Sequence, residues 1–166
     1  KEIYIDETSV NKLLIQNEEP VKKMSLENLD LNSVEKQLEA HPMIENAEVY
    51  IDLESRFHAD IKQREPIARV IGKKEFYIDS HGEIMPLSEN YSARVPIILD
   101  LDEKSIKPAY ELIKHIRQDL FFNHQTTLIK TYPKNLFGFK LRNHDFDVFV
   151  GKAENLEQKF MNFKAF

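Results

Sequence analysis

The chain has 166 residues, 42% hydrophobic and 31% charged, with 4 glycines and 7 prolines, which is typical of one ordinary or two small folded domains and excludes a disordered tail. The net charge of −5 argues against nucleic acid or anionic lipid as a partner. The absence of cysteine excludes disulfides, thiolate metal sites and thiol catalysis.

No run approaches the roughly 18 apolar residues that a membrane span needs. The sequence starts at Lys1 without a methionine, which suggests a fragment of a longer protein. A missing anchor in this stretch therefore says little about the parent chain.

The N-terminal stretch predicts a short extended piece at residues 3–5 and a helix over residues 7–16, with Asp6 as its N-cap. The helix has a narrow apolar stripe of Val10, Leu13 and Leu14 at helical spacing. Residues 17–23 are polar and contain a proline, so they form a loop that leads to a second extended piece at residues 24–29.

A second helix follows and ends at Pro42. Asn32 with Glu35 three residues later resembles a capping box. The apolar stripe of this helix consists of Leu31, Val34 and Leu38.

Residues 47–69 predict a β-hairpin whose apolar face has to be buried by other elements of the chain. Apolar residues alternate along both strands, so one face is apolar and the other is charged. On the apolar face we expect Ala47, Val49, Ile51 and Leu53 from the first strand, and Phe57, Ala59 and Ile61 from the second. On the polar face, Glu48 and Asp52 are expected opposite Lys62 and Arg64. The two preceding helices can pack on the apolar face, which gives a first domain.

After Pro66 the pattern predicts strands at residues 67–71, 75–79 and 83–87, with Asp79 and Ser80 at the rim of a turn. Residues 88–96 form an ordered loop, and residues 95–99 form an apolar strand.

The C-terminal stretch predicts the longest helix, over residues 105–122, and then an antiparallel meander. Its strands are residues 126–132, 136–143 and 145–150, with Asn143 and His144 as the second turn. Large side chains at helical spacing predict a last helix over residues 154–166.

The sequence contains no glycine-rich phosphate loop, no G-x-S-x-G and no H-E-x-x-H motif, which argues against an enzymatic function. His58 with Asp60 gives only half of a zinc site, and the other metal candidates are Asp79, His81 and His144. The carboxylates Glu18 with Glu19, and Asp100 with Asp102 and Glu103, are read as solvated surface charge. No cofactor is expected.

A strand-rich chain with open sheet edges favours partner binding by strand addition, although a protected edge without function fits the pattern about as well. The candidate protein-binding residues at an exposed edge are Phe146, Val148, Val150, Thr127 and Ile129.

Several segments together resemble the extracytoplasmic part of the bacterial cell-division family FtsQ/DivIB. The first segment carries Leu31, Val34, Glu35, Leu38, Pro42, Ile44, Ala47 and Val49, and it ends in Gln63, Arg64, Pro66, Ile67 and Ala68. The second carries Phe76, Tyr77, Ile78, Asp79 and Gly82, followed by Arg94, Val95 and Pro96. The last carries Val150, Gly151, Lys152, Leu156 and Phe160.

The resemblance implies an α+β fold, with a POTRA domain of two helices on a small sheet at residues 1–66. A mainly antiparallel β domain with flanking helices would follow at residues 67–166, and Pro66 would be the hinge. The implied function is a non-enzymatic divisome scaffold that binds FtsB/DivIC and FtsL and helps control septal peptidoglycan synthesis. The parent protein would cross the inner membrane once, with this part periplasmic and at the division septum.

One departure is that the family usually continues past the last helix into a final strand that accepts FtsB, and this sequence stops at Phe166. Two alternatives remain open. One is a POTRA-containing factor for outer-membrane protein assembly or secretion, and the other is a periplasmic cell-wall enzyme that uses His58, Asp60 and His144.

Overall fold

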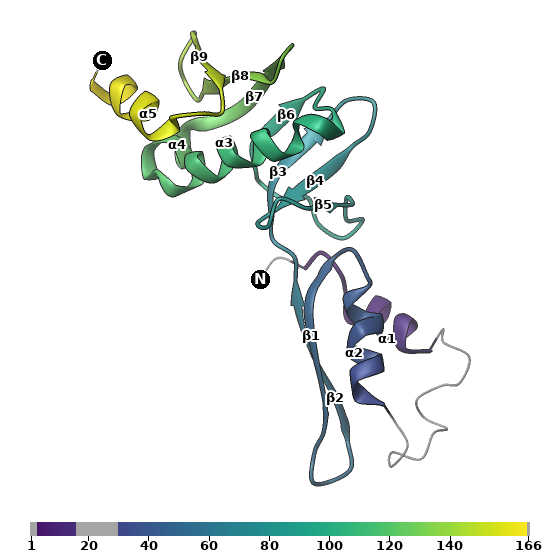
Figure 1. The fold of residues 1–166 in the computed structure, drawn as a ribbon. Helices are drawn as coiled ribbons and strands as arrows, with labels where there is room; N and C mark the ends of the chain where they lie inside the picture. The colour runs from purple at the N-terminus through teal and green to yellow at the C-terminus, as the bar shows by residue number, and fades with distance from the viewer. Residues whose placement is uncertain (1–2, 16–29, 166) are drawn as a thin grey trace. The chain divides into compact units, whose positions relative to one another are not determined.

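The computed structural model describes residues 3–15 and 30–165 (Figure 1). The loop expected at residues 17–23 and the extended piece expected at residues 24–29 lie outside the described residues. The chain divides into two compact units. Unit 1 contains Lys1–Arg64 and Ser88–Ser92, and unit 2 contains Glu65–Leu87 and Ala93–Phe166.

The two helices that the structure describes in unit 1 are each capped by an aspartate. Helix α1 spans Glu7–Ile15, and the Asp6 side chain accepts a hydrogen bond from the Ser9 amide at 2.8 Å, so the predicted cap is confirmed. Helix α2 spans Leu31–Glu39 and is capped by Asp30, which accepts from the Ser33 amide. The prediction of Asn32 as the cap is therefore wrong, because Asp30 already supplies the acceptor and Asn32 lies inside the first turn.

The predicted hairpin is confirmed as β1 (Ile44–Ile51) paired antiparallel with β2 (Phe57–Gln63). Buried side chains of α2 and β1, together with Ile5 just before α1, form one core: Ile5, Val34, Leu38, Ile44, Ala47 and Val49. Partly buried side chains of α1 and β2 pack against this core. The two helices therefore cover the apolar face of the hairpin, as the sequence predicted.

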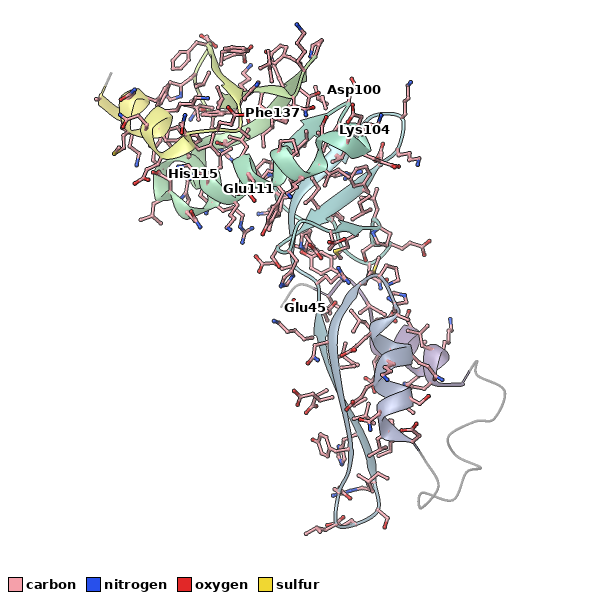
Figure 2. The ribbon with its side chains drawn as sticks, in the orientation of Figure 1. Glu45, Asp100, Lys104, Glu111, His115 and Phe137 are labelled. Atoms are coloured by element: carbon pink, nitrogen blue, oxygen red, sulfur yellow. The ribbon has the colours of Figure 1, made fainter. Side chains whose placement is uncertain are left out.

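The charges on the polar face of the hairpin pair differently from the prediction. Glu48 lies opposite Asp60 across the two strands. Lys62 forms an ion pair with Glu45, which Figure 2 labels. The Arg64 Nε donates to the Ile44 carbonyl at 3.2 Å.

Asp52 explains this register. Its carboxylate accepts from the backbone amides of Glu54 and Arg56, both at 2.9 Å, so the chain turns directly after β1. Phe57 consequently lies opposite Ile51, and Leu53 is a fully exposed turn residue and not a member of the apolar face.

Unit 2 is built on a seven-stranded sheet with the order β5-β4-β3-β6-β7-β8-β9 (Figure 1). Its strands are β3 (Pro66–Ile71), β4 (Phe76–Asp79), β5 (Ile84–Met85), β6 (Ile97–Leu99), β7 (Thr126–Tyr132), β8 (Leu136–Leu141) and β9 (Asp147–Lys152). The β7-β8-β9 meander is antiparallel, as predicted, and so are the β3-β4 and β4-β5 pairs. The short β6 pairs in parallel with both β3 and β7.

The long helix predicted over residues 105–122 is interrupted. A 3-10 turn at Glu103–Ser105 leads into α3 (Ile106–Gln118), and α4 (Leu120–Gln125) follows. Asp119 between them is extended, and its carboxylate accepts from the amides of Phe121 at 3.0 Å and Phe122 at 3.3 Å. Asp119 is thus the N-cap of a new helix, and the prediction of one continuous helix is wrong.

Asp79 does not lie at a rim. It is 0% exposed, and its carboxylate accepts from the backbone amides of His81 at 2.9 Å and Glu83 at 2.8 Å. Buried carboxylates require such donors, so Asp79 holds the turn between β4 and β5.

An aromatic cluster joins the sheet of unit 2 to its last helix, α5 (Leu156–Ala165). The Phe160 ring lies 4.4 Å from the Phe122 ring and 5.8 Å from the Phe139 ring, measured between centroids. His115, labelled on α3 in Figure 2, lies edge-on to Phe160 at 4.9 Å. The alternating residues predicted for β8 are confirmed as core, including Phe137 in the same figure.

Candidate protein-binding edge

Strand β9 is one of the two end strands of the seven-stranded sheet (Figure 1). It has six residues and pairs with β8, whereas the other end strand, β5, has only two residues. A very short edge strand is a common protection against strand addition. The longer β9 is therefore the better candidate for accepting a strand in this sheet.

The predicted binding residues of the C-terminal strand fall close to this edge. Val148 and Val150 belong to β9 and pack against the core of unit 2. Phe146 precedes the strand, because β9 begins at Asp147, and it is 50% exposed. Phe146 is therefore a turn residue, which corrects its expected place within the strand.

The other two predicted residues do not reach an edge. Thr127 and Ile129 lie on β7, which is paired on one side with β6 and on the other with β8. Ile129 is also 0% exposed. Their expected place at an exposed edge is wrong, because β6 pairs in parallel with β7 and covers it, a pairing that no local sequence pattern indicates.

A groove of about 480 Å³ runs between β9 and α5. Its apolar lining consists of Phe122, Phe139, Val148, Val150, Phe160 and Phe163, and Phe149 also borders it. Phe149, which is 65% exposed, is not among the residues predicted from the sequence. The available signal was that apolar residues stand at consecutive positions 148–150, so both faces of β9 carry apolar side chains.

Lysines gather around this edge. The Lys159 Nζ lines the groove and donates to the Lys152 carbonyl at 2.8 Å. Lys130 of β7 forms an ion pair with Asp147 at the start of β9. The hydrogen bond from Lys130 to Asp147 raises the pKa of the lysine, against the opposing effect of burial.

The candidate metal and catalytic residues are not brought together. His58 is held at 2.9 Å by Asp52 and stacks on Tyr50, with ring centroids 5.0 Å apart. His144 hydrogen-bonds the Arg142 carbonyl beside β8, four strands away from Asp79 on β4. Within residues 3–15 and 30–165, no group of three or more histidines or carboxylates is placed to hold a metal ion.

The paired carboxylates have structural roles where the structure describes them. Asp102 caps the 3-10 turn by accepting from the Ser105 amide at 2.8 Å, and hydrogen bonding to Ser105 lowers the pKa of its carboxyl. Glu103 forms an ion pair with Lys74 at 2.9 Å. Glu18 and Glu19 lie outside the described residues.

A family model described as "FtsQ/DivIB, C-terminal related" matches residues 65–166, which is more than half of the chain. The chain belongs to the FtsQ/DivIB family. A second model, described as a POTRA-like domain, matches residues 1–62. The fold is accordingly α+β, with a POTRA-like part of two helices on a small sheet followed by a larger β-sheet domain with flanking helices.

One similar solved structure is the major extracytoplasmic domain of the trans isomer of the bacterial cell-division protein DivIB from Geobacillus stearothermophilus. The two chains are 12% identical, the TM-score is 0.46, and the match covers 63% of this chain and 91% of that chain. The comparison with curated proteins gave no match.

Membership of the FtsQ/DivIB family places the chain among bacterial cell-division proteins. The family is generally a non-enzymatic scaffold family, and the matched region belongs to the extracytoplasmic part of a divisome membrane protein. In the described ranges, no helix combines the length and apolar character needed to cross a bilayer.

Proposed function

We propose that this FtsQ/DivIB protein is a non-enzymatic divisome scaffold that binds FtsB/DivIC and FtsL and thereby helps control septal peptidoglycan synthesis. A POTRA domain over residues 1–66 and a β domain over residues 67–166 would form its extracytoplasmic part. The parent protein would be anchored in the inner membrane by one span and act at the division septum, with this part in the periplasm.

The single observation that carries the proposal is the β9 edge with its apolar groove. Alternate residues of the six-residue β9 direct their backbone donors and acceptors away from β8, along the end of the sheet. In the described part of the chain, no side chain hydrogen-bonds the backbone amides of Asp147–Gly151. An incoming strand can therefore pair with the amides of Asp147–Gly151 without displacing a side-chain cap, whereas the Lys152 carbonyl at the end of β9 already accepts from Lys159.

The groove supplies what backbone pairing lacks, which is specificity. In strand addition the main-chain hydrogen bonds give affinity, and alternate side chains enter pockets. A strand paired with β9 would direct every second side chain toward the groove between β9 and α5, where Phe160 and Phe163 lie. Apolar residues at those alternating positions would fill it, so the proposed partner segment is extended and apolar at every second residue.

The test is a titration of the 166-residue chain with the periplasmic FtsB-FtsL coiled coil, followed by isothermal calorimetry. Phe149→Ala removes an exposed side chain of β9 and is expected to weaken binding by roughly tenfold or more, as for a buried interface aromatic. The matched control is Ile84→Ala on the opposite end strand, which is also exposed and is expected to leave binding unchanged.

No binding by the 166-residue chain would reject β9 as the binding edge, and no binding by a version of the domain extended beyond Phe166 would count against the scaffold proposal. If neither Phe149→Ala nor Ile84→Ala changes the affinity, the proposed partner would still stand, but β9 would be rejected as the binding edge. No observation favours either of the two alternative functions. An outer-membrane assembly factor would be expected to have a second POTRA repeat after the first, but residues 65–166 match an FtsQ/DivIB model, which supports the scaffold function.

A further inference from the structure

Two glutamates of α2 hydrogen-bond the outer edge of β1 in unit 1. The Glu35 Oε1 accepts from the Val49 backbone amide at 2.8 Å. The Glu39 Oε1 accepts from the Ala47 amide at 3.2 Å and from the Asn46 side chain at 3.1 Å. The amides of Ala47 and Val49 point away from β2, because the amides of a strand alternate between its two sides and these two are bound by the helix.

The spacing of the two partners explains why both bonds form at once. Two outward amides in one strand are about 6.6 Å apart, and residues four apart on a helix are about 6 Å apart along its axis. Glu35 and Glu39 therefore match Val49 and Ala47 in reverse chain order, which requires α2 to run antiparallel to β1. One helix face can thus cap two successive amides.

An edge strand with unbound amides is a template for another chain. The carboxylates on the outward amides of Ala47 and Val49 remove the two central donors that an incoming strand would use. We infer that Glu35 and Glu39 prevent strand addition at the β1 edge. When both carboxylates are removed, the strand that pairs with this edge is β1 of a second copy of this chain. This inference does not rest on the proposed function, because it concerns a different strand in the other unit.

The sequence of β1 permits this pairing. In a two-fold antiparallel pair centred on Ala47, each copy would offer the outward amides of Ala47 and Val49 to the other. Glu48 would then lie opposite Asn46 of the second copy, so no like charges would meet directly. The glutamate caps, and not charge repulsion, would therefore be what keeps the copies apart.

The experiment is amide hydrogen exchange by NMR on the 166-residue chain. Glu35→Ala is expected to accelerate exchange at Val49, and Glu39→Ala at Ala47, each by about tenfold or more, as expected for the loss of a charge-assisted hydrogen bond. Each single variant leaves the other amide capped as an internal control. Glu48→Ala, which removes an exposed carboxylate from the same strand, should change neither amide.

Sedimentation velocity then tests the occupant. Glu35→Ala with Glu39→Ala is expected to dimerise with rising concentration, with renewed protection of both amides, while Glu35→Gln with Glu39→Gln keeps an acceptor oxygen at each site and stays monomeric. Unchanged exchange in both single variants would overturn the capping role. If the amides of Ala47 and Val49 exchange faster but the double alanine variant stays monomeric, or if it forms a dimer in which these amides remain unprotected, the inference that the glutamates prevent pairing with a second copy is overturned. If the double variant does not fold, the two single variants still test the capping role.

Discussion

Replacing Phe160 by alanine tests whether α5 is a true part of the core of unit 2. Phe160 is 5% exposed, and its ring contacts those of Phe122, Phe139 and His115. A buried phenylalanine truncated to alanine costs roughly 3–5 kcal/mol through lost transfer energy and the cavity that remains.

Two features of the structure place the expected loss near the lower end of that range. Phe160 borders the groove between β9 and α5, so its neighbours have open space into which they can relax. In addition, α5 is the last helix of the described chain and can undock alone, which limits the loss to the free energy that docks it. We therefore expect about 3 kcal/mol.

The assay is urea unfolding of the 166-residue chain followed by far-UV circular dichroism, with amide exchange in β8 to isolate unit 2. Exchange is needed because two units need not unfold in a single transition. The matched control is Met161→Ala on the same helix, where the side chain is 52% exposed and the expected change is within about 0.5 kcal/mol. A loss below about 1 kcal/mol for Phe160→Ala would refute the reasoning, because α5 would then contribute little to the core.

Two further predictions concern turns. The Arg56 backbone amide and further hydrogen bonds hold the pKa of Asp52 well below 3.8, so the stabilisation by this carboxylate is complete above that value and declines as pH falls toward the lowered pKa. Acid titrations of unfolding should show the wild-type advantage over Asp52→Ala shrinking below about pH 4, and a constant gap would contradict this. Gly82 and Gly151 both have positive φ, but a Cβ would lie 2.9 Å from the Tyr110 ring at Gly82 and no closer than 3.9 Å to any neighbour at Gly151. In thermal unfolding, Gly82→Ala should therefore lower the free energy of unfolding by more than about 1 kcal/mol, and by more than Gly151→Ala does. Equal losses would mean that the backbone strain of a positive φ, and not the contact with Tyr110, determines the effect.

The elements that were predictable have strong local signals. The hairpin of β1 and β2 follows from strict alternation, and α1 from an aspartate directly before an apolar stripe. The meander of β7, β8 and β9 follows from two short turns, which leave neighbours in sequence no option except antiparallel pairing. In each case the residues that decide the structure are close together in the chain.

The features that were missed depend on distant residues or on competing local signals. Asp119 lies within an unbroken helical period of apolar residues, so the period suggested one helix although the carboxylate could start a second. Glu35 stands where a capping box would use it, yet it bonds an amide 14 residues later. The parallel pairs of β6 join strands separated by long connections, and no local pattern encodes them.

These non-local contacts also decide which edges can take part in binding. Sequence alternation alone made Thr127 and Val148 equivalent, because both belong to amphipathic strands with a polar neighbour. The sheet order separates them: the pairing of β6 with β7 encloses Thr127, while Val148 stays on an end strand. In unit 1 the same distinction is made by side chains, since Glu35 and Glu39 of α2 bind the outward amides of β1. An edge strand is therefore available only when neither another strand nor a helix carboxylate has taken its amides, and of β1, β7 and β9 only β9 meets that condition.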